Sequence, residues 1–147
     1  MKNLLLSLCL LALSSLSYAD GIISKTSNHT VKDTLDKLES IVTDKGFKVV
    51  ARVNHARAAE MNGLSLNPTE VLIFGNPKVG TALMKSNQAV GLDLPIKVIV
   101  WEDDKGVVTI AYNDPSWMVS RHNIADRDEV VKKMTGALGK FTDAAAN

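Results

Sequence analysis

The fold of this chain is decided by residues 94–112, which read LPIKVIVWEDDKGVVTIAY. Two apolar runs, Leu94–Trp101 and Gly106–Tyr112, flank the polar segment Glu102-Asp103-Asp104-Lys105. Apolar runs rich in β-branched residues around a short polar turn predict two antiparallel strands joined as a hairpin. Ile96–Trp101 is almost continuously apolar, which is typical of a strand that is covered on both faces or central in its sheet.

Three more strands are predicted before the hairpin, at Gly21–Lys25, Phe47–Asn54 and Glu70–Phe74. The second of them alternates with a period of two, which is typical of a half-buried strand. This period predicts one face with Phe47, Val49, Ala51 and Val53 and an opposite face with Lys48, Val50, Arg52 and Asn54.

Two long amphipathic helices are predicted around these strands. Thr30 is the expected N-cap of the first helix, and Gly46 ends it. Asp126 and Glu129 have the spacing of a capping box at the start of the last helix. Both helices carry apolar stripes at helical spacing, formed by Val31, Leu35, Leu38 and Ile41/Val42 in the first and by Val130, Val131, Met134, Leu138 and Phe141 in the last.

Shorter elements are expected between the strands and helices. The Ala-rich segment His55–Met61 predicts a short helix or turn. Asn76-Pro77 opens a helix that runs to about Asn87, because Asn caps helices and Pro suits their first position. Residues 113–123 are predicted to be a polar loop. Strands paired by a hairpin and bracketed by two amphipathic helices predict an α+β fold, with a single antiparallel sheet and two main helices packed on one face.

Residues 1–19 have the three parts of a secretory signal peptide. Lys2 gives a basic start, Leu4–Leu16 is apolar, and Ser17-Tyr18-Ala19 places small residues before a cut after Ala19. The apolar run is shorter than the roughly 20 residues that a membrane span needs. We therefore expect residues 20–147 to form one domain without a membrane span, in the periplasm as the first expectation and fully secreted as the second.

The charge and cysteine content of residues 20–147 exclude several classes of protein. Lys2 is the only charged side chain before Asp20, so 17 basic and 16 acidic residues become 16 and 16 after cleavage. A chain without net charge or a basic stripe argues against nucleic acid as a partner. Cys9, the only cysteine, leaves with the leader. Thiol catalysis, disulfides and thiolate metal sites are thereby excluded from the cleaved protein.

The order of several short motifs resembles that of the domain of unknown function 302 family, over nearly the whole of residues 20–147. The motifs are Gly46-Phe47, His55 with Ala56 and Ala59, Leu66-x-Pro68-Thr69, Phe74-Gly75-Asn76-Pro77 with Gly80-Thr81, Leu92-x-Leu94-Pro95, and Tyr112-x-Asp114-Pro115. The resemblance implies one curved antiparallel sheet with two helices, similar to the TATA-binding-protein arrangement, and makes a homodimer plausible. It implies no reaction, ligand or DNA binding, because function belongs to sites and not to folds.

The sequence offers two candidate sites, one at His55 and one at the helix start that follows Gly75. His55 comes directly after a strand, where an imidazole would serve as a general base or metal ligand, or else as a hydrogen-bonded residue that fixes the turn. Gly75, Asn76, Lys78 and Thr81 surround a helix start that would bind an anion, or else form a tight strand-to-helix corner. The spacing from Gly75 to Thr81 lacks the lysine of a nucleotide-binding loop.

Arg121 and His122 form a third candidate site, near Met118 and Trp117. Met and His are ligands for copper, but two ligands are too few for a metal site, so packing against the sheet is the favoured interpretation. No nucleophile, base and orienting group occur together in the sequence, and it identifies no cofactor. The leading hypothesis is thus a non-enzymatic envelope domain that binds a small ligand or a partner, and the alternative is an enzyme or metal-handling protein centred on His55.

Overall fold

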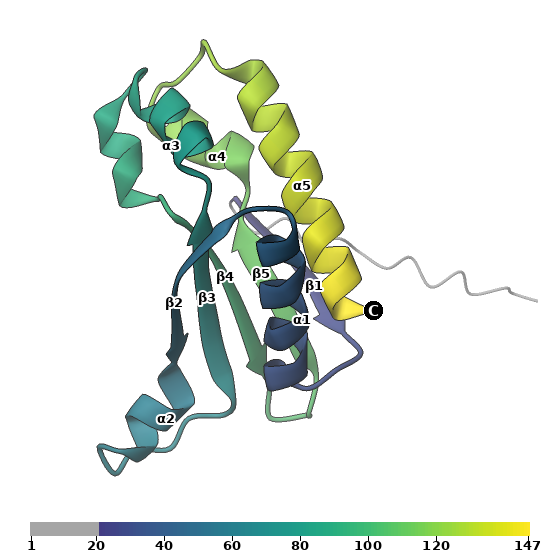
Figure 1. Cartoon of the computed structure of the whole chain (residues 1–147). Coiled ribbons are helices and arrows are strands. Elements are labelled where there is room, and N and C mark those ends of the chain that lie inside the picture. Colours follow the sequence, from purple (N-terminus) through teal and green to yellow (C-terminus); the bar gives the residue numbers. More distant parts are fainter. Residues whose placement is uncertain (1–20) are drawn as a thin grey trace, which may run out of the picture.

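The computed structural model describes residues 21–147, so the predicted signal peptide lies outside the described residues. Figure 1 shows a sheet with helices on one side. The elements in chain order are β1 (Ile22–Ser27), α1 (Val31–Asp44), β2 (Lys48–Asn54), α2 (His55–Glu60), β3 (Thr69–Gly75), α3 (Pro77–Met84), the 3-10 helix η1 (Gln88–Leu92), β4 (Ile96–Glu102), β5 (Val108–Asn113), α4 (Pro115–Arg121) and α5 (Asp128–Ala146).

The five strands form one antiparallel sheet in the order β1-β5-β4-β3-β2. The predicted hairpin is β4 and β5, with β4 central as its apolar sequence indicated. The Oδ1 atom of Asp103 accepts hydrogen bonds from the amides of Lys105 and Val107, both at 2.9 Å. Gly106 has a φ of 77°, which favours glycine. The acidic segment between the strands is therefore a turn held by its own side chain.

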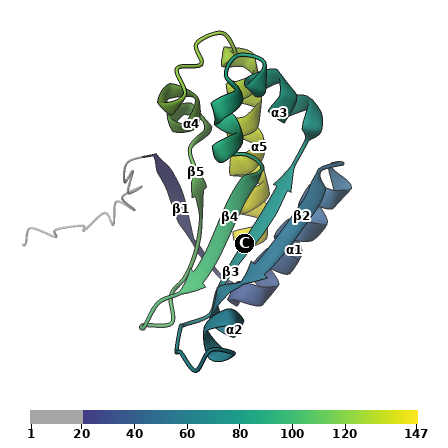
Figure 2. The ribbon, with the colours of Figure 1, turned by 90° about the vertical axis from the view of Figure 1, so that its left-hand side faces the viewer.

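Helices α1 and α5 pack on the same face of the sheet (Figures 1 and 2), which confirms the predicted α+β architecture. Their apolar stripes meet alternate residues of the central strands. The resulting core includes Leu35 and Leu38 of α1, Leu72 and Phe74 of β3, Val98 and Val100 of β4, Ile110 of β5, and Leu138 and Phe141 of α5. The Oγ1 atom of Thr30 accepts from the amide of Asp33 at 3.1 Å, as its predicted capping role requires.

The predicted alternation in β2 is wrong because the strand contains a register shift. Val49 pairs with Phe74, but Ala51 pairs with Ile73, so Val50 is an extra residue in a β-bulge. After the bulge every side chain changes face. Arg52 consequently points to α1, where its Nη1 atom lies 2.5 Å from the Oδ1 atom of Asp36.

Two further predictions about local structure are wrong. Residues 113–123 are not all loop, since Asp114 accepts a hydrogen bond from the amide of Ser116 and so caps α4, a short helix that buries Met118. The start of α5 has no side-chain capping bond. Asp126 instead pairs with the guanidinium of Arg127 at 3.1 Å, so the expected capping box with Glu129 does not form.

Candidate functional site

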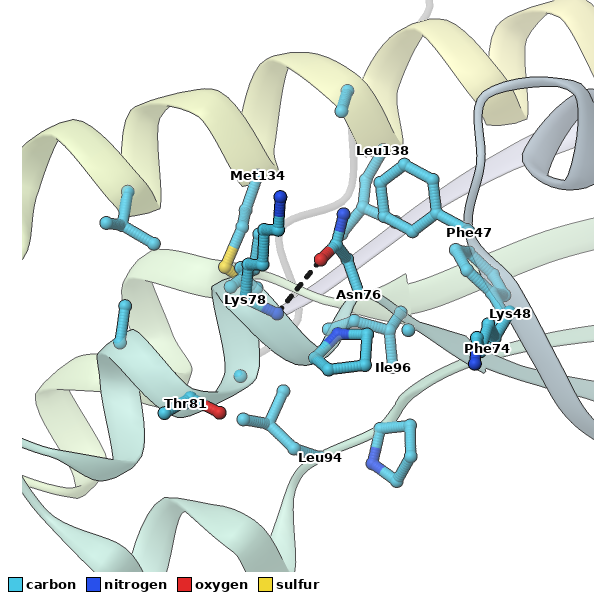
Figure 3. A pocket seen from close by; sticks show the side chains of 18 of the residues that line it. Phe47, Lys48, Phe74, Asn76, Lys78, Thr81, Leu94, Ile96, Met134 and Leu138 are labelled. Carbon is cyan, nitrogen blue, oxygen red and sulfur yellow. Dashed lines mark hydrogen bonds between the residues drawn. The ribbon is translucent and has the colours of Figure 1, made fainter.

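A cavity of about 710 Å³ lies between α3, α5 and the adjoining ends of β2, β3 and β4 (Figure 3). We call it the α3–α5 cavity. Four of the predicted site residues, Gly75, Asn76, Lys78 and Thr81, line it. Its apolar wall is formed by Phe47, Val50, Phe74, Pro77, Val79, Ala82, Met84, Leu94, Pro95, Ile96, Val130, Met134, Ala137, Leu138 and Phe141.

The corner between β3 and α3 sets one wall of this cavity. A Cβ atom on Gly75 would lie 3.3 Å from the Cβ of Pro95, so a larger residue would require Pro95 to shift by a few tenths of an ångström. The Oδ1 atom of Asn76 accepts from the amide of Lys78 at 3.0 Å (Figure 3), and Pro77 has no amide hydrogen. The amide of Val79 donates to the Asn76 carbonyl at 3.0 Å. The first amides of α3 are therefore already engaged, as expected for a tight corner.

Phenylalanine rings close the cavity on the side of the core. Phe47 meets Phe74 edge to face with the ring centroids 6.0 Å apart, and it meets Phe141 in the same way at 5.5 Å. In Figure 3, Phe47 and Phe74 lie on one side of the opening, and Met134 and Lys78 lie on the other. Such edge-to-face contacts favour a fixed ring arrangement. The wall is thus shaped by packed aromatic groups from β3, α5 and the segment before β2.

The charged side chains around the cavity are all basic. Lys48, Lys78 and Lys133 are exposed lining residues, and no Asp or Glu belongs to the lining. A second hollow of about 630 Å³ lies beside the cavity, between α3 and the start of α5. Lys78 lines both hollows, and the second also includes Lys85 and Arg127. An apolar interior therefore adjoins a cationic surface.

Arg121 and His122 lie outside the α3–α5 cavity and form a cluster with Asp93. The Nε2 atom of His122 lies 2.5 Å from Oδ2 of Asp93, and Nη1 of Arg121 lies 3.0 Å and 3.2 Å from the two carboxylate oxygens. Arg121 also stacks 5.5 Å from the ring centre of Trp117. The imidazole of His122 is 7% exposed. This cluster joins the end of η1 to the end of α4, which is a structural contact that the sequence did not suggest.

His55 lies apart from the other predicted site residues. It begins α2 after β2, whereas Gly75 ends the antiparallel partner β3. Figure 1 shows α2 at one end of the sheet and α3 and α4 at the other. His55 is exposed, and within residues 21–147 no hydrogen bond of its side chain is found. The structure therefore does not bring His55 together with Asn76, Arg121 or His122.

The described part of the chain contains no cluster of three or more His, Cys, Asp or Glu side chains that would hold a metal ion. Among residues 21–147, no helix has both the length and the hydropathy of a membrane span.

Most of the cavity wall was missed by reasoning from the sequence. The stripe of Met134, Leu138 and Phe141 was identified, but only as core. The signal that could have identified the cavity wall was the length of the last helix relative to the strands. The 19 residues of α5 extend about 28 Å, whereas the seven residues of β4 extend about 23 Å. A helix that overruns its sheet leaves part of its apolar stripe without a strand beneath it.

The family model "Domain of unknown function DUF302" matches residues 23–141. The chain belongs to the DUF302 family. Its fold is similar to that of an uncharacterised conserved DUF302 protein from Bacillus stearothermophilus, with a TM-score of 0.69, 22% identity, and coverage of 87% of this chain and 97% of that chain. This likeness shows the fold alone.

The curated relatives of this DUF302 chain are longer proteins. It is 39% identical over 127 residues to "Fluoride-specific ion channel FluC 1" of Brucella suis biovar 1, covering 86% of this chain and 50% of the relative. The same identity and length are found with "Fluoride-specific ion channel FluC 2" of Brucella melitensis biotype 1, covering 47% of that relative. The DUF302 chain thus spans about half the length of the curated relatives that it matches.

Proposed function

We propose that residues 20–147 form a non-enzymatic binding domain whose small-molecule ligand occupies the α3–α5 cavity. The observation that carries the proposal is the cavity itself, with a volume of about 710 Å³ and a predominantly apolar wall. Ligand sites in proteins are concave, mostly apolar and typically about 300–1,000 Å³ in volume. Among the described residues, the lining includes lysines but no His, Asp or Glu, the side chains that most often act as general acids and bases.

Nile red, a neutral apolar dye, tests whether the cavity binds. Ala137 lines the cavity from α5, so Ala137→Phe places a ring in the space that the ligand needs. We expect the wild-type protein to raise Nile red fluorescence. We expect Ala137→Phe to lower the affinity for Nile red by about tenfold or more, which corresponds to about 1.4 kcal/mol in binding free energy.

Ala144→Phe is the matched control, because Ala144 is exposed on the same helix and does not line the cavity. Circular dichroism melting curves would establish that both variants are folded. Equal dye affinity in the wild type and both variants would contradict a ligand site in the cavity.

We propose that the domain forms a homodimer through the face of the sheet that α1 and α5 leave open, onto which Figure 2 looks. The register places half-buried apolar residues on this face, including Val71, Ile73, Ile99 and Trp101. Within the strands, Lys48 and Lys97 are the only charged side chains on that face. An almost uncharged face can lie against its own copy about a two-fold axis without like-charge contacts.

Light scattering after gel filtration tests the dimer. Ile99→Lys places a charge at the centre of the open face and should give monomers, because an unpaired buried charge is costly. Val107→Lys, in the exposed hairpin turn, should leave the dimer intact. A wild-type protein that remains monomeric at high concentration would contradict the proposal.

We also propose that the protein is exported and cleaved after Ala19. The support is the basic, apolar and small-residue pattern of residues 1–19. Mass spectrometry of the protein purified from envelope and culture medium should give a chain that begins at Asp20. Recovery of a full-length chain from the cytosol alone would refute export.

A further inference from the structure

The α3–α5 cavity and the second hollow form one continuous surface. They share five lining residues, Pro77, Lys78, Thr81, Ala82 and Val130. The first hollow is walled mainly by apolar side chains, whereas the second has three cationic groups, Lys78, Lys85 and Arg127. An apolar compartment therefore opens beside a cationic one.

The positive charge of this surface is only partly compensated. Arg127 is held in place, since its Nε donates to the Ala82 carbonyl at 2.9 Å and its Nη1 lies 3.1 Å from Oδ2 of Asp126. Lys78 and Lys85 have no ion pair or side-chain hydrogen bond to any other residue in the range 21–147. No carboxylate lines either hollow. These two ammonium groups are thus available to an external anion.

We infer that the ligand is a single-chain amphiphile with an anionic head group, an inference that rests on the proposed binding function of the α3–α5 cavity. The apolar chain lies in the cavity, and the head group lies beside Lys78 and Lys85. Lysine side chains bind the head group, because the first amides of α3 are already engaged by Asn76. An apolar cavity without the adjoining charges would favour an alcohol over a carboxylate on the same chain, because the carboxylate costs more to desolvate.

Three probes with one chain and different heads test this inference: dodecanoate, dodecanol and dodecylammonium, each below its micelle concentration, measured by displacement of Nile red. We expect dodecanoate to bind about tenfold more tightly than dodecanol and dodecylammonium to bind most weakly, as partly exposed charge contacts of this number would give. Raising the salt concentration should lower the affinity for dodecanoate and leave the affinity for dodecanol unchanged.

The double variant Lys78→Gln/Lys85→Gln should lower the affinity for dodecanoate to that for dodecanol, without changing the affinity for dodecanol. Lys132→Gln is the matched control, because Lys132 is an exposed lysine of α5 that lines neither hollow. Unchanged dodecanoate affinity in the double variant would overturn the inference.

The outcomes separate this inference from the proposed function. Equal binding of all three probes, still blocked by Ala137→Phe, would overturn the anionic head group while leaving the binding domain in place. Failure of Nile red to bind, with no heat of binding for any of the three probes in isothermal titration calorimetry, would overturn both. Sedimentation with phosphatidylglycerol vesicles without binding of monomeric dodecanoate would overturn the single-chain ligand in favour of a membrane surface.

Discussion

The two ends of the sheet bury apolar surface in different ways. Near α1, the stripes of α1 and α5 both lie over strands, and residues such as Leu35 and Leu38 have no exposed surface. Near α3, α5 continues past the strands and faces α3 across a cavity of about 710 Å³. The comparison teaches that an apolar helical stripe indicates burial only as far as another layer covers it. Where the covering layer ends, the same stripe lines a cavity.

The largest expected effect is a difference in the free energy of unfolding between variants at the two ends of the sheet. Leu35→Ala removes a fully buried side chain from the closed end and should cost about 2–5 kcal/mol, because a cavity replaces packed atoms. Met84→Ala, at the open end, should cost less than about 1 kcal/mol, since Met84 is 36% exposed. Urea denaturation measures both. Equal costs would show that Met84, beside the cavity, is packed as tightly as Leu35.

A smaller effect is expected from the cluster that joins η1 to α4 at the open end. Asp93→Ala removes the carboxylate that both Arg121 and His122 contact, and it leaves the buried imidazole of His122 without this partner. We expect a loss of about 1–3 kcal/mol in the free energy of unfolding. Asp44→Ala, which changes an exposed carboxylate, is the control. A loss no greater than that of the control would show that this end is held by apolar contacts alone.

The smallest effect concerns the charges that join β2 to α1 at the closed end. Hydrogen bonds from Lys32 at 2.6 Å and from Arg52 at 2.5 Å lower the pKa of Asp36 below its ordinary value of 3.8. Arg52 also contacts Glu70 at 2.8 Å. Arg52→Gln should cost about 1 kcal/mol at pH 7, because these pairs are partly exposed.

The pH dependence gives the sign of this effect. A carboxylate with a lowered folded-state pKa contributes stability above its unfolded value, and this contribution is lost as the pH falls through the folded pKa. The difference between the wild type and Arg52→Gln should therefore shrink below pH 3.8. Urea denaturation between pH 7 and acidic pH measures it, with the exposed Arg57→Gln as control. A constant difference across this range would exclude a contribution from Asp36.

Local sequence patterns predicted the fold well at turns and helix caps, where the residue type itself favours one local structure. The turn residues between β4 and β5, the Thr30 cap and the Asn76-Pro77 corner are all as expected. The patterns failed where a neighbouring strand or helix decides the outcome. The bulge at Val50 depends on pairing with β3. The start of α4 is different, because Asp114-Pro115 is a local cap-and-proline signal like Asn76-Pro77 and was overlooked.

The candidate site was only half predictable for the same reason. Gly75, Asn76, Lys78 and Thr81 form one sequence motif, and they line one cavity. Lys85, Arg127 and Lys133 carry no local signal, since exposed lysines and arginines occur on most helices. Asp93 becomes a partner of His122 only because the chain returns to η1 after 29 residues.

The sequence by itself determined the α+β class, the two helical stripes and the neutral, cysteine-free composition of residues 20–147, because these depend on residue identity and short-range spacing. Only the tertiary structure decided that most of the α5 stripe, including the core residues Leu138 and Phe141, also forms the wall of a cavity. The reason is that a hollow forms where α5 outruns the strands, and relative length and position are properties of packed elements rather than of any one segment.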